Sequence, residues 1–378
     1  MRDFQVFGLE VPLLWPGVFQ MNEQYIHDLL ALYPADCCPQ AIKDLGGAGG
    51  FSGAAFWQLS TKRGLLCLRR WPSHADPNWP ERLDFIHAVL EHVARREFSL
   101  VPMPIRTLQG ASHVRRDGHH WELTAWLPGR ADYLPLRRPE KLLAALTALA
   151  EFHGAAADFR ELDQEPAPSP GILARRRQID DLRTRGLPAI AAAIDNAPRP
   201  AHGIDGHDRT AIVGLARRLL PLYARAEEPV LQKLIAAERS RVPLQPCIRD
   251  IWHDHVLFLE NRVSGLIDFG AMRTDNVAGD VARLLGSFSF DSFDSFDASK
   301  SETDAELWRD GLAAYESVRP LSADERQLVG VFDRSTTLLA GINWLEWLFV
   351  ERRTFADLAA VRVRLAGIVA RLERLTQA

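Results

Sequence analysis

The segment Cys247–Gly270 constrains the fold more than any other part of the sequence, because it combines strand patterns with several ionisable residues. Its apolar runs Val256–Leu259 and Val263–Ile267 flank a short turn, which is the pattern of an antiparallel hairpin. A hairpin returns the chain to its starting end. We therefore expect His255 and Asp268 to lie side by side.

Asp250 stands just upstream, on the loop that leads into this hairpin. Two carboxylates and an imidazole, from positions that are near one another in the sequence, are thus expected to lie close together in space. Phosphoryl transfer needs such a set, because one carboxylate must orient the attacking hydroxyl and others must hold the metal that bridges the phosphates. A zinc site at His253 and His255 is the rival interpretation, but no H-E-x-x-H motif or cysteine cluster supplies further ligands.

The apolar runs in the first third of the chain indicate strands more often than helices. Ala54–Ser60 and Leu65–Arg70 flank a turn and predict a hairpin, and Ser112–Arg115 and His120–Trp126 are also strand-like. Between these pairs, Glu81–Arg95 has apolar residues at helical spacing. A small β-rich lobe is therefore expected here.

Beyond Leu127-Pro128-Gly129 the pattern becomes helical. Pro139 begins a stretch with leucines on one face, and Gly154 is expected to end it. Residues 160–240 predict several further helices, as does most of the C-terminal part. The prediction is an α+β protein with an N-terminal lobe, residues 1–128, and a mainly helical lobe, residues 129–378, that carries the catalytic loop and the hairpin.

Composition excludes several classes of function. Of 378 residues, 47% are hydrophobic and 25% charged, so the chain can bury a sizeable core. A net charge of −4 gives no basic field for nucleic acid or an anionic membrane, and no run approaches the roughly 18 apolar residues that span a bilayer. No signal-peptide pattern is present, and the four cysteines form no C-x-x-C pair. A cytoplasmic protein with reduced thiols is expected, and its oligomeric state is not indicated.

Cys247–Gly270 resembles the catalytic loop and metal-binding hairpin of the aminoglycoside phosphotransferase and choline kinase-like family, relatives of protein kinases. That family shows His-Gly-Asp, an Asn five residues after the Asp, and then an Asp-Phe-Gly-like triplet. Here His255 follows Asp250 by five residues, and Asp268 follows it by 18. Downstream, Asp280-Val281-Ala282 resembles the family's Asp-Leu-Ala segment, whose Asp braces the catalytic loop.

The resemblance implies a protein-kinase-like two-lobe fold and an ATP-dependent phosphotransferase acting on a hydroxyl of a small molecule. It implies Asp250 as catalytic base, Asp268 and His255 as metal ligands, and Mg²⁺, with Mn²⁺ as the alternative, as the ion. Glu122–Gly129 resembles the strand and hinge that hold adenine, which implies backbone contacts at Ala125 and Leu127.

A glycine cluster before the first hairpin supplies further candidates: Gly47, Gly49, Gly50 and Ser52. A dinucleotide fingerprint needs G-x-G-x-x-G before a helix, whereas here Ser52 takes the third glycine place and a hairpin follows. A loop that covers phosphates with bare backbone amides fits better. A surface turn without a ligand is the alternative.

Three positions depart from the family pattern. Arg69 stands where the third strand normally carries a phosphate-binding lysine, and its usual acidic partner is not evident, since Ile86 occupies the aligned helix position and Glu81 and Glu91 are the nearest acids. Ile248 replaces the His of the catalytic loop, and His255 replaces the Asn that binds the second metal. These departures leave a catalytically weak pseudokinase, a nucleotide- or protein-binding module, as the alternative function.

Other aromatic and histidine positions have simpler interpretations. Ser287–Asp297 alternates phenylalanine with aspartate and predicts either a loop or a contact to a cationic substrate. Trp344 and Trp347 lie at helical spacing and are expected in the core. His87 and His153 are expected as packed or surface residues on helices.

Overall fold

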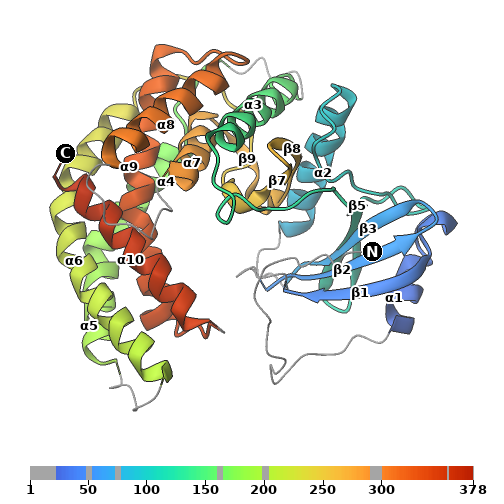
Figure 1. The fold of residues 1–378 in the computed structure, drawn as a ribbon, viewed down its shortest axis with the longest axis horizontal. Helices are drawn as coiled ribbons and strands as arrows, with labels where there is room; N and C mark the ends of the chain where they lie inside the picture. Colours follow the sequence, from blue (N-terminus) through green and yellow to red (C-terminus); the bar gives the residue numbers. More distant parts are fainter. Residues whose placement is uncertain are drawn as a thin grey trace. The chain divides into compact units, whose positions relative to one another are not determined.

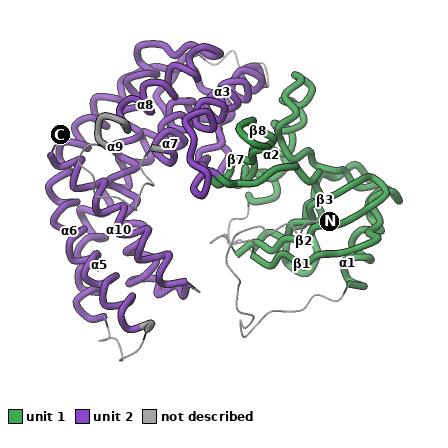
Figure 2. Tube along the Cα trace, viewed as in Figure 1, with its two compact units in different colours: residues 1–132, 254–270 green, residues 133–253, 271–378 purple. Residues whose placement is uncertain are grey.

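The computed structural model describes residues 23–47, 53–72, 78–159, 165–197, 204–289, 300–355 and 357–377. They form two compact units, residues 1–132 with 254–270 and residues 133–253 with 271–378 (Figure 2). The sequence pattern placed the hairpin after His253 with the helical lobe. In the structure this hairpin clusters with the β-rich unit.

Unit 1 is built on one five-stranded antiparallel sheet in the order β1-β2-β3-β5-β4 (Figure 1). Its elements are α1 (Glu23–Leu30), β1 (Pro39–Gly46), β2 (Ala55–Thr61), β3 (Gly64–Arg70), α2 (Trp79–Arg95), β4 (Val114–Arg116) and β5 (His119–Ala125). The expected hairpin, helix and strand pair are confirmed. Strand β1 was not expected from the sequence, because it is an edge strand whose side chains are mostly exposed and show no apolar alternation.

The core of unit 1 lies on one face of this sheet. Trp57 of β2 stacks on Trp121 of β5 with ring centroids 5.6 Å apart. Leu59, Leu68 and Leu123 are fully buried beside them. Adjacent strands thus present large apolar side chains to the same side, which fixes the register of the strand that carries Arg69.

The hairpin β7 (Val256–Leu259) and β8 (Arg262–Leu266) forms at the predicted place. It joins unit 1 through paired backbone hydrogen bonds between Arg130 and Phe258, at 3.0 and 2.8 Å. Gly129 makes this approach feasible, since it has φ +101° and a Cβ there would lie 2.7 Å from the Phe258 carbonyl oxygen.

Unit 2 is mainly helical, with β6 (Gln245–Cys247) paired to β9 (Arg273–Asp275). Its helices are α3 (Pro139–Ala156), α4 (Pro170–Asp181), α5 (Leu187–Asp195), α6 (Ile204–Ala237), α7 (Ala278–Ser289), α8 (Lys300–Glu316), α9 (Ala323–Leu345) and α10 (Leu358–Leu375). Trp344 packs with Leu365 as the core prediction expected. Helix α3 continues two residues beyond Gly154, where the sequence predicted its end. None of the described helices is long and apolar enough to cross a membrane.

Candidate active site

Unit 1 contains a cluster of charged residues around Arg69, which β3 places on the opposite side of the strand from Arg70. The Arg69 Nη2 donates a hydrogen bond to Asp268 Oδ1 at 3.2 Å. The guanidinium lies over the Trp71 ring, 3.4 Å from its centroid, and Arg69 is only 9% exposed. Stacking on an aromatic face holds this cation in a fixed position beside the carboxylate.

His255 and Asp268 are neighbours, as the hairpin predicts. Their Nε2 and Oδ2 atoms are 3.6 Å apart. Burial alone would raise the pKa of Asp268, but the charges of Arg69 and His255 outweigh it and hold that pKa below its usual value. Asp268 is therefore a carboxylate at neutral pH. Its role as a metal ligand, with His255, stays a prediction.

The acidic partner of Arg69 comes from strand β5, not from helix α2. Glu122 lies directly opposite Arg69 in the sheet register, with Oε1 3.9 Å from Nη1. Its second oxygen is 2.7 Å from His87 Nε2. Burial alone would raise the pKa of Glu122, but His87 and then Arg69 lower it. The sequence left the acidic partner of Arg69 undetermined; at the aligned part of α2, Ile86 is buried, and α2 contributes His87.

If Arg69 binds phosphate, as the resemblance implies, Arg69→Ala should raise the Kd for ATP by about 10- to 100-fold, because a charge-assisted contact would be lost. Arg70→Ala is the matched control, since the adjacent side chain points to the other face of the strand, and Arg69→Lys should recover part of the affinity because it keeps the charge. Nucleotide titration of all three variants measures this. Equal affinities in the Arg69→Ala and Arg70→Ala proteins would contradict the assignment.

Asp250 lies in unit 2, on the loop that follows β6. Its side chain is 56% exposed, and Arg283 of α7 donates to its Oδ1 from Nε at 3.3 Å and Nη2 at 3.1 Å. A carboxylate held in place by one arginine and open to solvent can accept a hydrogen bond from a substrate hydroxyl. The predicted catalytic base is therefore accessible.

Asp280 fixes the backbone of this loop, as the resemblance implies. Its Oδ2 accepts a hydrogen bond from the Ile248 amide and its Oδ1 accepts one from the Arg249 amide, both at 2.6 Å. Arg249 has φ +70°, a left-handed conformation that a side chain other than glycine rarely adopts. The two bonds to a buried carboxylate stabilise that conformation one residue before Asp250.

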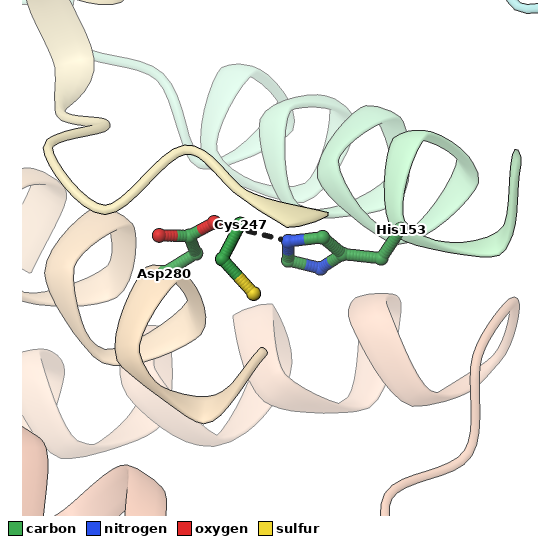
Figure 3. Close-up of side chains that lie close together, drawn as sticks. All are labelled: His153, Cys247 and Asp280. Atoms are coloured by element: carbon green, nitrogen blue, oxygen red, sulfur yellow. Dashed lines mark hydrogen bonds and ion pairs between the residues drawn. The ribbon is translucent and has the colours of Figure 1, made fainter. Parts of the chain in front are cut away.

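His153 of α3 lies beside Asp280 and forms a hydrogen bond with it (Figure 3). Its Nε2 donates to Asp280 Oδ2 at 3.1 Å, and its Nδ1 accepts a hydrogen bond from the Tyr315 hydroxyl at 2.8 Å. Burial lowers the pKa of His153 despite the carboxylate, so the imidazole is neutral. The sequence predicted a packed or surface histidine; the side chain is fully buried, and it also donates a hydrogen bond to Asp280.

Cys247 completes the group in Figure 3, where three possible ligand atoms lie within 4.8 Å of one another. Burial raises the pKa of its thiol well above the usual value, so the thiol stays protonated. The thiol donates to the Asp275 carbonyl, and both oxygens of Asp280 already accept amide hydrogens. These side chains therefore support the loop rather than offer a metal site.

The remaining candidates are only partly described. Gly47 lies in an exposed turn after β1, while Gly49, Gly50 and Ser52 lie outside the described residues. The Ala125 amide donates to the Met103 carbonyl at 3.0 Å, so an adenine contact at Ala125 would use its carbonyl oxygen. The contacts predicted at Ala125 and Leu127 stay predictions.

The first residues of the aromatic segment Ser287–Asp297, which the sequence predicted as a loop or a contact to a cationic substrate, belong to helix α7. Phe288 is buried against Tyr133, with ring centroids 4.2 Å apart. Ser287 is also buried, and its hydroxyl accepts a hydrogen bond from the His253 amide at 2.9 Å. Residues 290–299, with the other phenylalanines and aspartates, lie outside the described residues.

Sequence comparison identifies relatives over most of the chain. Residues 46–321, more than half its length, match the family model described as the phosphotransferase enzyme family. The homoserine kinase of Acidiphilium cryptum is 28% identical over 302 residues, which cover 78% of this chain and 80% of the relative. The homoserine kinase of Granulibacter bethesdensis is 25% identical over 317 residues, or 81% and 83% of the two chains.

Solved structures share the fold. The amicoumacin kinase hAmiN, solved with AMP-PNP, Ca²⁺ and Ami, aligns with a TM-score of 0.59 at 13% identity and covers 93% of both chains. Spectinomycin phosphotransferase APH(9)-Ia, solved with ADP and spectinomycin, aligns with a TM-score of 0.58 at 10% identity over 94% of this chain and 98% of that one. The expected kinase-like α+β fold is confirmed. The chain belongs to the phosphotransferase enzyme family, and its activity is the ATP-dependent transfer of a phosphoryl group to a hydroxyl of a small molecule.

Proposed function

We propose that the acceptor is a short-chain alcohol bearing a carboxylate, with homoserine as the first compound to test. Relatives that match about four-fifths of the chain are homoserine kinases. The observation that carries the catalytic part of the proposal is the exposed Asp250 carboxylate on a loop whose backbone is bound by the buried Asp280. Such a fixed loop positions the base without reorganisation during the reaction.

In this proposal Asp250 orients the acceptor hydroxyl and accepts its proton as the oxygen attacks the γ-phosphate of ATP. Arg283 limits the rotation of the carboxylate through its contacts to Oδ1. In unit 1, Arg69 contributes positive charge for the α- and β-phosphates, as a strand lysine does in related folds. Glu122 and Trp71 hold that guanidinium in place.

Asp268 and His255 are the residues that would hold the metal of the metal–ATP complex. A carboxylate oxygen suits Mg²⁺, whereas an imidazole nitrogen suits later divalent ions better. The 3.6 Å separation of the two side chains allows both to face one ion. When bound, the ion neutralises charge on the phosphates.

We expect His255→Asn to shift metal preference from Mn²⁺ toward Mg²⁺, because an amide oxygen replaces the nitrogen ligand. The measurement is the Kd of each ion for the protein with ADP, by calorimetric titration, together with the transfer rate in each ion. His253→Asn, on the same segment, serves as the control. If the Mn²⁺-to-Mg²⁺ ratio is unchanged in His255→Asn, the residue is not a ligand.

A direct assay tests the proposed function. The full chain is incubated with ATP, Mg²⁺ or Mn²⁺, and homoserine, and transfer is followed by ADP release and by ³¹P NMR of the product. Acceptor-dependent ADP release supports the proposal. Nucleotide binding without transfer to any acceptor would favour the alternative, a pseudokinase, for which the departures at Arg69, Ile248 and His255 are the motivating observations.

A further inference from the structure

Unit 2 contains a cavity of about 460 Å³ that opens beside Asp250. Its walls come from α4, the loop after β6, α7, α9 and α10, so the whole cavity lies within one unit. Pockets of about 300–1,000 Å³ hold ligands of drug-like size, and this one exceeds the needs of an unbranched amino acid. Because the proposed base Asp250 lines this cavity, we expect the acceptor to bind there.

The ionisable side chains that line this cavity are almost all cationic. One carboxylate, Asp250, is accompanied by five arginines, which are Arg175, Arg249, Arg283, Arg364 and Arg371. Asp250 itself is paired with Arg283. Arg249 pairs with Asp275 and Arg371 with Asp333, two carboxylates that do not line the cavity. Among the described lining residues, no further acid is available to bind an ammonium group.

Arg175 is the arginine best placed to bind an anion. Among the described residues no carboxylate lies within ion-pairing distance of it, and it donates only to neutral oxygens, Gly171 O at 3.4 Å and Thr336 Oγ1 at 3.3 Å. Its guanidinium stacks on Phe332, 4.6 Å from the ring centroid. Burial lowers the pKa of Arg175 to about 10, while the charge of Asp275 acts in the opposite direction.

The other walls suit an uncharged part of the acceptor. Gln178 donates to Asn343 at 2.9 Å, and both side chains line the cavity with Thr336. Trp344 and Trp347 add aromatic surface, with ring centroids 5.3 Å apart. A ligand that fills the cavity therefore meets cations, amides and aromatic rings rather than acids.

We infer that this cavity selects an anionic hydroxy acid without a free amine, whose carboxylate binds Arg175 and whose hydroxyl lies at Asp250. The inference rests on the proposed function and narrows it: the acceptor is still an alcohol that bears a carboxylate, but an acid without an ammonium group is preferred over homoserine. Homoserine is zwitterionic, and its ammonium has no carboxylate partner in the described walls other than Asp250. The volume and the two tryptophans leave room for an aromatic or branched body between the carboxylate and the hydroxyl.

Four acceptors with the same carbon chain test the charge preference: 4-hydroxybutyrate as anion, homoserine as zwitterion, 1,4-butanediol as neutral molecule and homoserine amide as cation. We expect kcat/KM to fall in that order, with at least about 10-fold between the anion and the diol, as one charged hydrogen bond predicts. 4-(Hydroxymethyl)benzoate against 1,4-benzenedimethanol repeats the comparison with an aromatic body. Homoserine used better than 4-hydroxybutyrate, or the diol used as well as the acid, would overturn the inference.

Arg175→Gln tests whether Arg175 is the residue that binds the carboxylate of the acceptor. It should raise KM for 4-hydroxybutyrate by at least about 10-fold with little change in kcat, and raise KM for the diol much less. Arg177→Gln is the matched control, because it lies on the same helix, is exposed and does not line the cavity. Equal KM values in the two variants would overturn the role of Arg175.

Binding without ATP separates this inference from the proposed function. Calorimetric titration with 4-hydroxybutyrate and 4-(hydroxymethyl)benzoate should detect binding that Arg175→Gln removes. If the acids bind in this way but no acceptor receives phosphate, the proposed function fails and the anion site stands. If transfer occurs without preference for acids, the function stands and the anion site fails. Absence of both binding and transfer rejects both.

Discussion

Asp250→Asn is expected to lower kcat by about 10²–10⁴-fold while the affinity for ATP changes little. The amide has the size of the carboxylate but cannot accept the proton of the attacking hydroxyl. Because Asp250 is exposed and bonded to the side chain of Arg283, its replacement should not disturb the fold. The measurements are steady-state transfer, nucleotide titration and the thermal unfolding midpoint.

Asp254→Asn is the control for this variant, since it removes a nearby carboxylate from the same segment. It should retain most of the transfer rate. Arg283→Gln should give an intermediate result, because Asp250 keeps its charge but loses the contact that limits its rotation. Transfer near the wild-type rate in Asp250→Asn would reject Asp250 as the base.

Asp280→Asn is expected to lower the free energy of unfolding by about 3 kcal/mol and to abolish most transfer. The buried carboxylate accepts amide hydrogens from Ile248 and Arg249 as well as the His153 Nε2 hydrogen. An asparagine amide would present its own hydrogens to at least one of these donors. The loop that carries Asp250 would then lose its fixed conformation. Urea unfolding and steady-state transfer measure the two effects.

Tyr315→Phe provides a graded comparison. It removes only the hydroxyl that donates to His153 Nδ1, so a cost of about 1 kcal/mol and partial activity are expected. If Asp280 and Tyr315 only filled space in the core, Asp280→Asn and Tyr315→Phe would lower the free energy of unfolding by equal amounts. Neither substitution would then lower kcat of the folded protein. Wild-type stability and rate in Asp280→Asn would show that the hydrogen bonds do not position the loop.

Local patterns were sufficient to predict the two hairpins and the segment that carries Asp250 and Asp268. A short turn between apolar runs determines which residues become neighbours, so the proximity of His255 and Asp268 follows from their spacing. The resemblance added the role of Asp280, because a motif carries tertiary information that spacing alone does not.

Contacts between distant segments could not be predicted in this way. Glu122 pairs with Arg69 only because β3 and β5 are adjacent in the sheet, although α2 and β4 separate them in the sequence. Arg175 and Thr336 meet through the packing of α4 against the C-terminal helices, and no local pattern distinguishes Arg175 from the other arginines of its segment. Single-sequence patterns report periodicity, whereas these contacts depend on which elements pack together.

The way in which Asp280 holds the catalytic loop bears on how this sequence could diverge. Its carboxylate binds the main-chain N–H groups of positions 248 and 249, and every residue except proline offers such a group. A side chain other than the family's histidine at position 248 therefore leaves this hydrogen bond intact, and Ile248 is fully buried in the core. A departure at this motif position therefore does not by itself remove the hydrogen bonds that hold the loop.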